Sequence, residues 1–378
     1  MSDLLFVTWD GGGNVPPLLA LAGRLQGCGH KVRVMGHPQQ ADAVTACGLP
    51  FVPFTQAPAF SATARNSPIR LIGLFGDKTM GRDVSAELRA RPADVVVVDC
   101  LLFGAMDAVR RAGTPYVVLE HLFDGYLRGS LLRGPMGLAL RARRLHAKAL
   151  LDAAERCLLA TLPELDPVRG TPGNRVHTGP FVTAEPAAPA DRTVLLSLST
   201  YHYAGMLDVW QRALDAVADL PVRVVATTGP AVDPGQLRAP DNVEVRAWAP
   251  HSAVMPTVSA VVGHGGHATT MLALAHGLPL LVIPLFRLVD QPMVAKAVQD
   301  AGAGLALPKS SSPQRIRVTL ERLLADPAYS ERAASLAERI RALDGLHRAA
   351  DAVEALVAAG AGGAPGTTRD HGSLSTPS

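Results

Sequence analysis

The regular alternation of short apolar runs with helical patterns constrains the fold of this chain more than any other feature. In both halves of the chain the runs are continuous and rich in valine and leucine, as in ADVVVVD at residues 93–99. Strands of this kind, connected through helices, form parallel sheets that are covered on both faces. We therefore predict an α/β protein built from doubly wound domains. The predicted strands lie at residues 4–9, 31–37, 93–99, 114–121, 193–200, 222–229, 243–248, 260–264 and 278–284.

The length of the chain and one stretch rich in Pro and Gly divide it into two domains. A chain of 378 residues is too long for one ordinary core. We predict an N-terminal domain at 1–180, a linker at 181–192 and a C-terminal domain at 193–360, whose final helix could pack back on the N-terminal domain. The low-complexity tail at 361–378 is predicted to be disordered. Ligands of doubly wound domains bind beyond the carboxyl ends of the strands, so a central cleft between two facing domains is the expected site.

Composition excludes several classes of protein. The net charge of +3 is small for this length, so we expect no nucleic-acid partner. The four cysteines are far apart and form no metal-binding or disulfide pattern, which favours a reducing compartment. The amino terminus lacks the pattern of a signal peptide, and the apolar stretch at 271–286 is broken by His, Gly and Pro. A cytoplasmic protein without integral membrane contact is therefore expected.

A glycine-rich turn between a predicted strand and a predicted helix suggests an anion-binding site. His264, Gly265, Gly266 and His267 come directly after the buried strand, and a helical pattern that contains Thr269 follows. Free N–H groups at a helix N-terminus bind phosphate, and glycine lets the backbone approach it closely. An ordinary tight turn with a surface histidine would explain the same residues.

Further motifs along the chain resemble the donor-binding signature of family 1 glycosyltransferases with the GT-B fold, two Rossmann-like domains that face a central cleft. After the His-Gly-Gly turn come GLP at 277–279 and the Asp290–Gln291 pair. Upstream lie SLST at 197–200, ATTG at 226–229 and Trp-Ala-Pro at 248–250, in the family's order. Within the family, the chain most resembles bacterial enzymes that attach sugars to natural products, including antibiotics.

The resemblance implies a role for each matching residue. Trp248 would stack on the nucleotide base while backbone groups near Ala249 read its edge, and Asp290 and Gln291 would bind the sugar hydroxyls. The remaining donor-site residues would hold or adjoin the diphosphate. These are Thr200, Gly229, His264, Gly265, Gly266, His267 and Thr269. The implied donor is a nucleotide diphosphate sugar, with dTDP or UDP as the nucleotide, and the implied acceptor is a small hydrophobic molecule. No metal or other cofactor is expected, and a homodimer is left open.

Two departures from the family pattern concern the sugar. The family turn is usually Gly-Gly-x-Gly, whereas His267 and Ala268 follow the two glycines here. The loop PLFRLVDQ is two residues longer than the common PLFxDQ, which could change the reach of Asp290. Both departures put sugar selectivity in question more than donor binding.

The usual catalytic base of the family is missing. An inverting enzyme needs a base that deprotonates the acceptor hydroxyl, and the family takes it from a histidine after the first strand, paired with an aspartate. Here Asn14 stands at the histidine position, while Asp99 matches the aspartate of the pair. Asp10, His121 and Asp124 are the candidate replacements, with His121 and Asp124 favoured. Alternatively, the acceptor is acidic, a phenol or an activated carbon as in C-glycosyltransferases of this family, or the chain is an inactive homologue.

Several of these residues have an alternative structural explanation. Asn14 could cap the following helix, Asp99 could be a buried structural carboxylate, and Trp248 could belong to a core. An NAD-dependent oxidoreductase is disfavoured because DGGGNVPP is a poor dinucleotide fingerprint and no acidic residue closes the next strand. A catalytically weak nucleotide-sugar-binding partner protein and a nucleotide-sugar epimerase are the alternatives to a glycosyltransferase.

Overall fold

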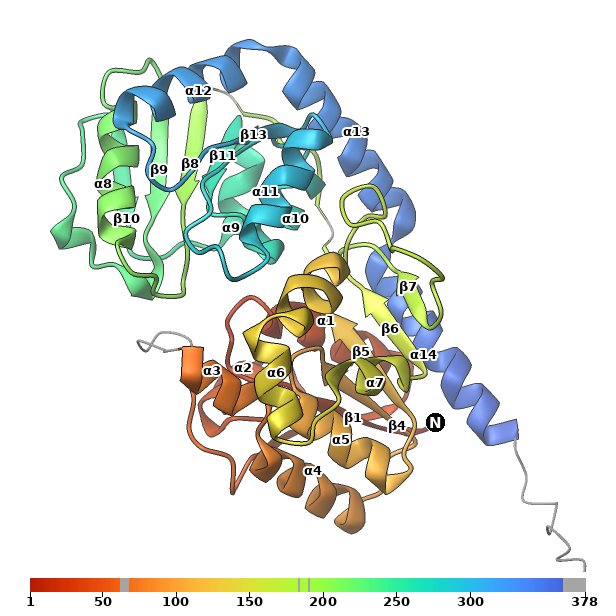
Figure 1. Cartoon of the computed structure of the whole chain (residues 1–378). Coiled ribbons are helices and arrows are strands. Elements are labelled where there is room, and N and C mark those ends of the chain that lie inside the picture. Colours follow the sequence, from red (N-terminus) through yellow and green to blue (C-terminus); the bar gives the residue numbers. More distant parts are fainter. Residues whose placement is uncertain (62–67, 183, 190, 363–378) are drawn as a thin grey trace, which may run out of the picture.

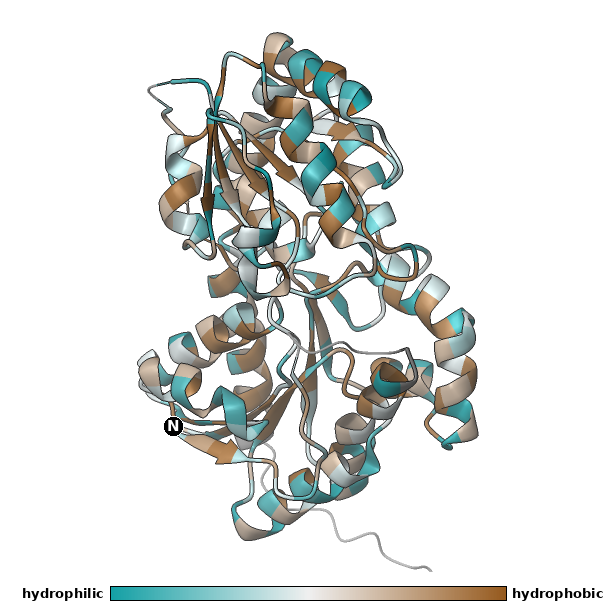
Figure 2. Cartoon of the chain, turned by 90° about the vertical axis from the view of Figure 1, so that its left-hand side faces the viewer, coloured by the Kyte–Doolittle hydropathy of each residue, from teal (hydrophilic) through white to brown (hydrophobic). Residues whose placement is uncertain are grey.

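The computed structural model of the chain contains two parallel sheets, one in each half (Figure 1). It describes residues 1–61, 68–182, 184–189 and 191–362, so the predicted disordered tail lies outside the described residues from 363 onward. Strands and helices alternate along both halves, and this arrangement confirms the predicted α/β class. Figure 2 shows that the strands of both sheets are hydrophobic, while the helices carry mixed surfaces.

The N-terminal sheet has seven strands in the order β3-β2-β1-β4-β5-β6-β7. All of its strand pairs are parallel, and β1 pairs with both β2 and β4 at the centre. Its strands are β1 (Asp3–Val7), β2 (Lys31–Gly36), β3 (Phe51–Pro53), β4 (Val95–Asp99), β5 (Tyr116–Glu120), β6 (Arg156–Leu159) and β7 (Arg175–His177). Four predicted strands match this sheet, whereas β3, β6 and β7 were not predicted.

Helices cover both faces of this sheet because alternate strand side chains point to opposite sides. One apolar cluster joins the strands to α1 and α14, and another joins them to α4, α5 and α7. The helices of this half are α1 (Val15–Gly27), α2 (Ala41–Ala46), α3 (Pro68–Phe75), α4 (Lys78–Ala90), α5 (Phe103–Ala112), α6 (Pro135–Ala142) and α7 (Ala147–Asp152). Shorter turns are η1 (Pro38–Gln40) and the π-helical η2 (Gly125–Leu131).

The C-terminal sheet has six parallel strands in the order β10-β9-β8-β11-β12-β13. These are β8 (Thr193–Ser197), β9 (Arg223–Thr227), β10 (Val243–Arg246), β11 (Ala260–Gly263), β12 (Leu280–Val282) and β13 (Gly304–Ala306), of which β13 was not predicted. Its helices are α8 (Met206–Val217), α9 (His251–Val254), α10 (His267–Ala275), α11 (Gln291–Asp300) and α12 (Pro313–Ala325). The turns η3 (Gly229–Ala231), η4 (Pro234–Gln236) and η5 (Met255–Thr257) connect them.

Two long helices, α13 (Pro327–Leu343) and α14 (Gly345–Gly362), run from the C-terminal half back to the N-terminal half (Figure 1). Asp344 bends the chain between them in a left-handed conformation, with φ of 47°. Gly345 passes so close to the segment after β7 that an added Cβ would lie 2.4 Å from Gly179 O. Helix α14 then packs on α1, where His347 Nδ1 lies 2.9 Å from Arg24 Nη2.

The loops at the carboxyl ends of the two sheets meet. Tyr126 Oη, in η2, donates a hydrogen bond to Leu288 O at 2.7 Å across the domain boundary. The rings of Phe123 and His267 are also in edge contact, with centroids 6.2 Å apart. Residues that follow strands of both sheets therefore surround one shared site. Within the described residues, no helix is both long enough and apolar enough to cross a membrane.

Candidate active site between the two sheets

Asn14 lies just after the first strand and holds Asp99, at the end of β4. Its Nδ2 donates to Asp99 Oδ2 at 2.8 Å and to Trp9 O at 3.0 Å. Its side chain makes no capping hydrogen bond to α1, so the helix-cap alternative does not describe this residue. Asn14 is 3% exposed, and its Oδ1 has no hydrogen-bond partner among the described residues.

His121, at the end of β5, forms an ion pair with the same aspartate. Its Nε2 lies 3.0 Å from Asp99 Oδ2, without the alignment of a hydrogen bond. Asp99 Oδ1 accepts from Leu101 N at 3.0 Å. Burial opposes charge on both side chains, but their mutual attraction prevails, so the pKa of His121 is raised well above its usual value and that of Asp99 is lowered. Asp99 is therefore part of a charged pair rather than an isolated structural carboxylate.

The same neighbourhood offers one group of potential metal ligands. The donor atoms of Asp99, Cys100 and His121 lie within 4.8 Å of one another, and all three residues are buried. The pairing of His121 with Asp99 explains this closeness without an ion. Burial raises the pKa of the Cys100 thiol to about 11, which disfavours the thiolate that a metal would need.

The structure places Asp124 and Asp10 differently from His121. Asp124 is buried, and its two carboxylate oxygens contact Arg128 Nε at 2.7 Å and Arg175 Nη1 at 3.1 Å. A carboxylate held by two guanidinium groups is a poor proton acceptor, so the structure does not favour Asp124 as the base. Asp10 is half-buried in the turn between β1 and α1. Of the three predicted replacements, His121 is the one paired with Asp99.

The glycine turn after β11 has the geometry that an anion site requires. Gly265 adopts φ of 83°, and an added Cβ would lie 2.9 Å from Val282 Cγ1 and 3.1 Å from Gln291 O. Gly266 precedes α10, and an added Cβ would lie 2.6 Å from His264 Nε2. At these two glycines the backbone before α10 packs closely against both the His264 ring and the start of α11.

Two neutral histidines flank this turn. Burial lowers the pKa of both His264 and His267 to about 3. His264 Nδ1 and His267 Nε2 are buried and have no hydrogen-bond partner among the described residues. Thr269 lies half-buried in the first turn of α10. The turn therefore offers unused polar atoms beside the free amides of a helix N-terminus.

Thr200 and Gly229 adjoin this turn from the neighbouring loops. Thr200 is exposed after β8, and Gly229 is so close that an added Cβ would lie 3.4 Å from Thr200 Cα. From the other domain, an added Cβ on Gly12 would lie 3.4 Å from Thr200 Oγ1, and one on Gly13 would lie 3.6 Å from Ala268 Cβ. The glycine turn before Asn14 therefore lies close to the loop after β8 and to the first turn of α10.

Trp248 and Ala249 follow β10 at the outer edge of the C-terminal sheet. Trp248 is 70% exposed, which rules out the alternative that its indole belongs to a core. Ala249 is buried beside it. An indole left in solvent offers a face on which a planar group can stack.

The Asp290–Gln291 pair is only partly free to bind a ligand. Gln291 Oε1 accepts from Leu285 N at 2.8 Å and from Phe286 N at 3.1 Å, so this oxygen is already engaged within the protein. Asp290 Oδ2 is buried without a hydrogen-bond partner among the described residues. Burial raises the pKa of Asp290 to about 7, against opposing effects of His121 and the Phe123 backbone. Asp290 therefore faces the N-terminal domain near the His121–Asp99 pair.

Residues that the sequence analysis missed also contribute to this junction. Leu288, within the two-residue-longer loop, accepts the hydrogen bond from Tyr126, so the added length serves the contact between domains. Phe123 packs its ring against His267. The position of both aromatic residues just after β5 was the available signal, because residues at the carboxyl ends of parallel strands line ligand sites.

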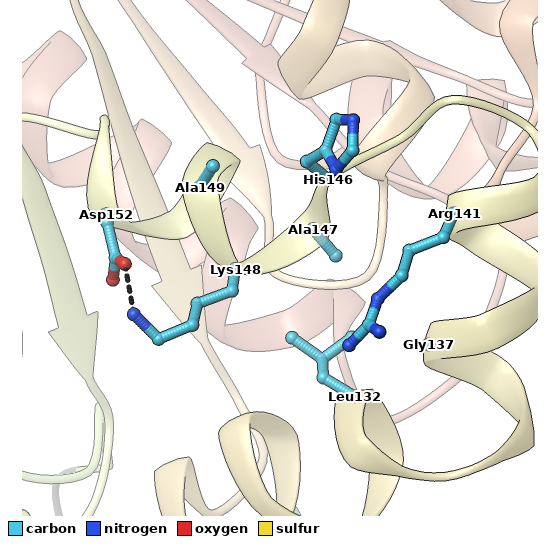
Figure 3. Close-up of a pocket in the computed structure, with 8 residues that line it drawn as sticks. All are labelled: Leu132, Gly137, Arg141, His146, Ala147, Lys148, Ala149 and Asp152. Atoms are coloured by element: carbon cyan, nitrogen blue, oxygen red, sulfur yellow. Dashed lines mark hydrogen bonds and ion pairs between the residues drawn. The ribbon is translucent and has the colours of Figure 1, made fainter.

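A separate hollow lies on the outside of the N-terminal domain (Figure 3). It has a volume of about 280 Å³ and lies between the end of η2, α6 and α7. Lys148 on its wall pairs with Asp152 at 2.7 Å, while Arg141 and His146 are exposed. None of the predicted site residues lines it, so it is distinct from the junction of the two sheets.

Comparison with known proteins agrees with this geometry. Residues 12–181 match the glycosyl transferase 4-like domain, and residues 211–356 match the C-terminal domain of erythromycin biosynthesis protein CIII-like proteins. A relative named 4'-demethylrebeccamycin synthase, from Lentzea aerocolonigenes, is 28% identical over 94% of this chain and 99% of its own length. Aclacinomycin-T 2-deoxy-L-fucose transferase from Streptomyces galilaeus is 27% identical over 88% of this chain and 91% of its own.

A solved structure shares the whole architecture. The glycosyltransferase of kitacinnamycin superposes with a TM-score of 0.79 at 26% identity, covering 94% of this chain and 98% of that one. Two parallel-sheet α/β domains that superpose on this structure define the GT-B fold. The chain is therefore a glycosyltransferase, similar to bacterial enzymes of antibiotic biosynthesis.

Proposed function

We propose that this glycosyltransferase moves a hexosyl or deoxyhexosyl group from a dTDP- or UDP-sugar to a small aromatic or polyketide-like acceptor, with inversion at the anomeric carbon. The observation that carries the proposal is the position of the His121–Asp99 pair opposite the N-terminus of α10. A proton acceptor and a binding site for the leaving diphosphate would then face each other where the two domains meet, and the proximity of His121 to His267 supports this. This arrangement suits a direct displacement at a sugar carbon.

On the donor side, the diphosphate would lie at the N-terminus of α10. The amides of Gly266 and His267 and the ring of His264 would donate to its oxygens, where the helix dipole also favours negative charge. Exposed Trp248 would stack on the base, and Thr200 would add a hydroxyl donor. Asp290 and the Gln291 amide would bind sugar hydroxyls. No metal ion is required in this scheme, because amides and side chains neutralise the leaving group.

On the acceptor side, His121 would serve as the base. Its Nε2 faces Asp99, which leaves Nδ1 to receive the proton. The acceptor oxygen forms its bond to the anomeric carbon as the bond from that carbon to the diphosphate oxygen breaks. The acceptor proton passes to His121, and the electron pair leaves with the diphosphate. Asp99 stabilises the imidazolium that forms.

Asn14 would take a holding role in place of the family's histidine. Its amide donates to Asp99 and fixes the carboxylate in the position from which it contacts His121. In this scheme the base, His121, follows β5, whereas the family's histidine follows the first strand. The aspartate, Asp99, is at the same position in both. An acidic acceptor, either a phenol or an activated carbon, would lower the demand on this base.

The test is turnover by the purified full-length chain. UDP- and dTDP-sugars are incubated with a panel of phenolic and polyketide-like acceptors, and products are analysed by mass spectrometry. We expect an acceptor mass increased by one sugar, release of nucleoside diphosphate, and the inverted anomeric configuration by NMR coupling. Activity should persist in EDTA. Binding of neither UDP nor dTDP, or a retained configuration, would contradict the proposal.

A further inference from the structure

The loop before the Asp290–Gln291 pair is two residues longer than the family's common form, and the added length includes an interdomain contact. Leu288, within this loop, is 68% exposed, so its side chain contributes little to packing. Its backbone oxygen instead accepts the hydrogen bond from Tyr126 Oη at 2.7 Å. Tyr126 is buried in η2 of the N-terminal domain. The contact therefore joins the backbone of a C-terminal-domain loop to a buried hydroxyl of the other domain.

A second contact joins the same two segments. An added Cβ on Gly125, the first residue of η2, would lie 3.3 Å from Met293 Sδ, in α11. The absence of a side chain at Gly125 thus lets α11 pack closely against the start of η2. Leu288 and Met293 lie on either side of Asp290 in the chain. The segment that carries the proposed sugar-binding pair therefore meets η2 at two points.

The start of η2 is itself fixed within the N-terminal domain. Asp166 is buried, and its carboxylate accepts hydrogen bonds from Asp124 N at 2.5 Å and from Gly125 N at 3.2 Å. Tyr126 N donates to Phe123 O at 3.0 Å. The Tyr126 hydroxyl is therefore presented to the other domain from a backbone that is held at several points.

This contact lies between the two groups that the proposed mechanism must align. His121 comes five residues before Tyr126, and Asp290 comes two residues after Leu288. Burial raises the pKa of Tyr126 and the charge of Asp290 adds to that increase, while His121 opposes the effect of burial on the pKa of Asp290. The three side chains thus share one neighbourhood. A displacement of about 1 Å between reacting groups can reduce a rate about 100-fold, so a contact at this place bears on the reaction.

We propose that Tyr126 is a positioning residue for glycosyl transfer, which fixes the loop of Asp290 through Leu288 O and so holds the donor sugar in line with an acceptor on the N-terminal domain. The inference rests on the proposed function and goes beyond it by assigning a role to the added loop residues. The diphosphate would be held at the N-terminus of α10, away from this contact. Tyr126 therefore acts on the placement of the sugar and not on the affinity for the nucleotide.

The first measurement needs no ligand. Amide hydrogen exchange of the full-length chain, followed by mass spectrometry, reports local opening of the loop. Leu285 N and Phe286 N donate to Gln291 Oε1, so they exchange slowly while the loop is held. Tyr126→Phe keeps the ring and removes the hydroxyl. Exchange at these two loop amides should become about three- to tenfold faster, as expected for the loss of one neutral hydrogen bond.

The second measurement compares transfer with hydrolysis of the donor, using the sugar nucleotide and acceptor that the turnover assay identifies. In Tyr126→Phe, kcat for transfer should fall about three- to tenfold, while the Kd of UDP or dTDP stays unchanged. Hydrolysis should fall less, because water is small and can adjust to a displaced sugar, whereas a bulky acceptor cannot. A protein that was merely destabilised would lose both reactions in equal proportion. A lower ratio of transfer to hydrolysis therefore identifies a positioning role.

Tyr116→Phe is the matched control. Tyr116 Oη also donates to a backbone oxygen, that of Leu150, at 2.5 Å, but both residues lie within the N-terminal domain. This variant loses the same kind of hydrogen bond as Tyr126→Phe. It should keep the wild-type exchange of the two loop amides and the wild-type ratio of transfer to hydrolysis.

Gly125→Ala is a second variant, because the added methyl would press on Met293 and push α11 away from η2. It should change both measurements in the same direction as Tyr126→Phe. Unchanged exchange in both variants, an unchanged ratio in both, or equal changes in Tyr116→Phe would overturn the inference. Absence of any turnover would remove the proposed function, and faster exchange in Tyr126→Phe would then still support the hold of Tyr126 on the loop.

Discussion

His121 Nε2 lies 3.0 Å from Asp99 Oδ2, although the two residues follow different strands. Strands β4 and β5 are neighbours in the sheet, with Asp99 in register with Leu119, so their carboxyl ends bring the two side chains together. In the proposed mechanism, this pairing would supply the proton acceptor, because Asn14 stands where the resemblance implies a histidine base. The carboxylate that holds His121 is itself held by Asn14.

Replacement of Asn14 by alanine should weaken catalysis without weakening donor binding. The change removes a hydrogen bond to a charged carboxylate, which contributes about 1.5–3 kcal/mol. We expect kcat/KM to fall about 10- to 100-fold, with the Kd for UDP or dTDP unchanged. Steady-state kinetics and calorimetry measure the two quantities. A folded Asn14→Ala variant with wild-type kcat/KM would show that this amide does not position Asp99.

His264→Ala, unlike Asn14→Ala, should weaken binding of the donor. His264 is neutral and has an unpartnered Nδ1, so its loss removes a hydrogen bond to the diphosphate. The Kd of the donor should rise about 10- to 100-fold. Gly266→Ala is a second variant, because the added methyl would collide with the His264 ring and displace it. Wild-type donor affinity in both variants would remove the assigned role of this turn.

The affinity for the sugar nucleotide should depend on pH through Asp290. Burial raises the pKa of this carboxyl to about 7, so it is protonated below that pH and becomes an acceptor for sugar hydroxyls above it. We therefore expect donor affinity to increase by up to about tenfold between pH 6 and pH 8. Asp290→Asn should bind weakly and lose this increase in calorimetry. Asp300→Asn, a change at an exposed aspartate of the same helix, should retain it.

Stability should fall with rising pH because of Glu120. This residue is fully buried, and its carboxylate lies 3.6 Å from Arg128 Nη2 without a hydrogen bond. Burial raises its pKa to about 8 from an ordinary value of 4.5, so the folded state holds a proton that the unfolded state releases. The contribution to stability is therefore fully present below about pH 4.5 and is lost as pH rises toward 8.

Because the side chain of Glu120→Gln cannot ionise, the stability of this variant should not decrease in this way as pH rises. The Tm of the variant relative to wild type should rise between pH 6 and pH 9, by about 2–4 °C for each kcal/mol relieved. Glu155→Gln, at an exposed position directly before the neighbouring strand β6, is the control and should show no such trend. A pH-independent difference in Tm for Glu120→Gln would indicate that Glu120 stays charged in the folded protein.

The central strands could be predicted because they are buried on both faces, which produces continuous apolar runs such as Val95–Val98. The three-residue strands β3, β7 and β13 were missed because Pro, Gly or polar residues interrupt the apolar run around each, whereas the equally short β12 lies within LPLLVIP. Strand β6 begins with the exposed Arg156 and has only four residues, so its apolar run is equally short.

The donor turn could be located from the sequence because glycine, histidine and threonine stand next to each other in the chain. The pairing of His121 with Asp99 could not, because it depends on the register of two strands. The same holds for Asp124, whose carboxylate is engaged by Arg128 and Arg175 from different elements.

The pH dependence of kcat/KM for wild type, His121→Asn and Asp99→Asn tests the central claim most directly. If His121 is the base, the wild-type rate rises with pH to a midpoint above 6.5, because the imidazole must lose its proton before it can accept another. Asp99→Asn should move that midpoint to lower pH, since the anion that stabilises the charged ring is gone. His121→Asn should lose the rise and about 100-fold or more in rate. An unchanged pH profile and rate in His121→Asn would contradict the account.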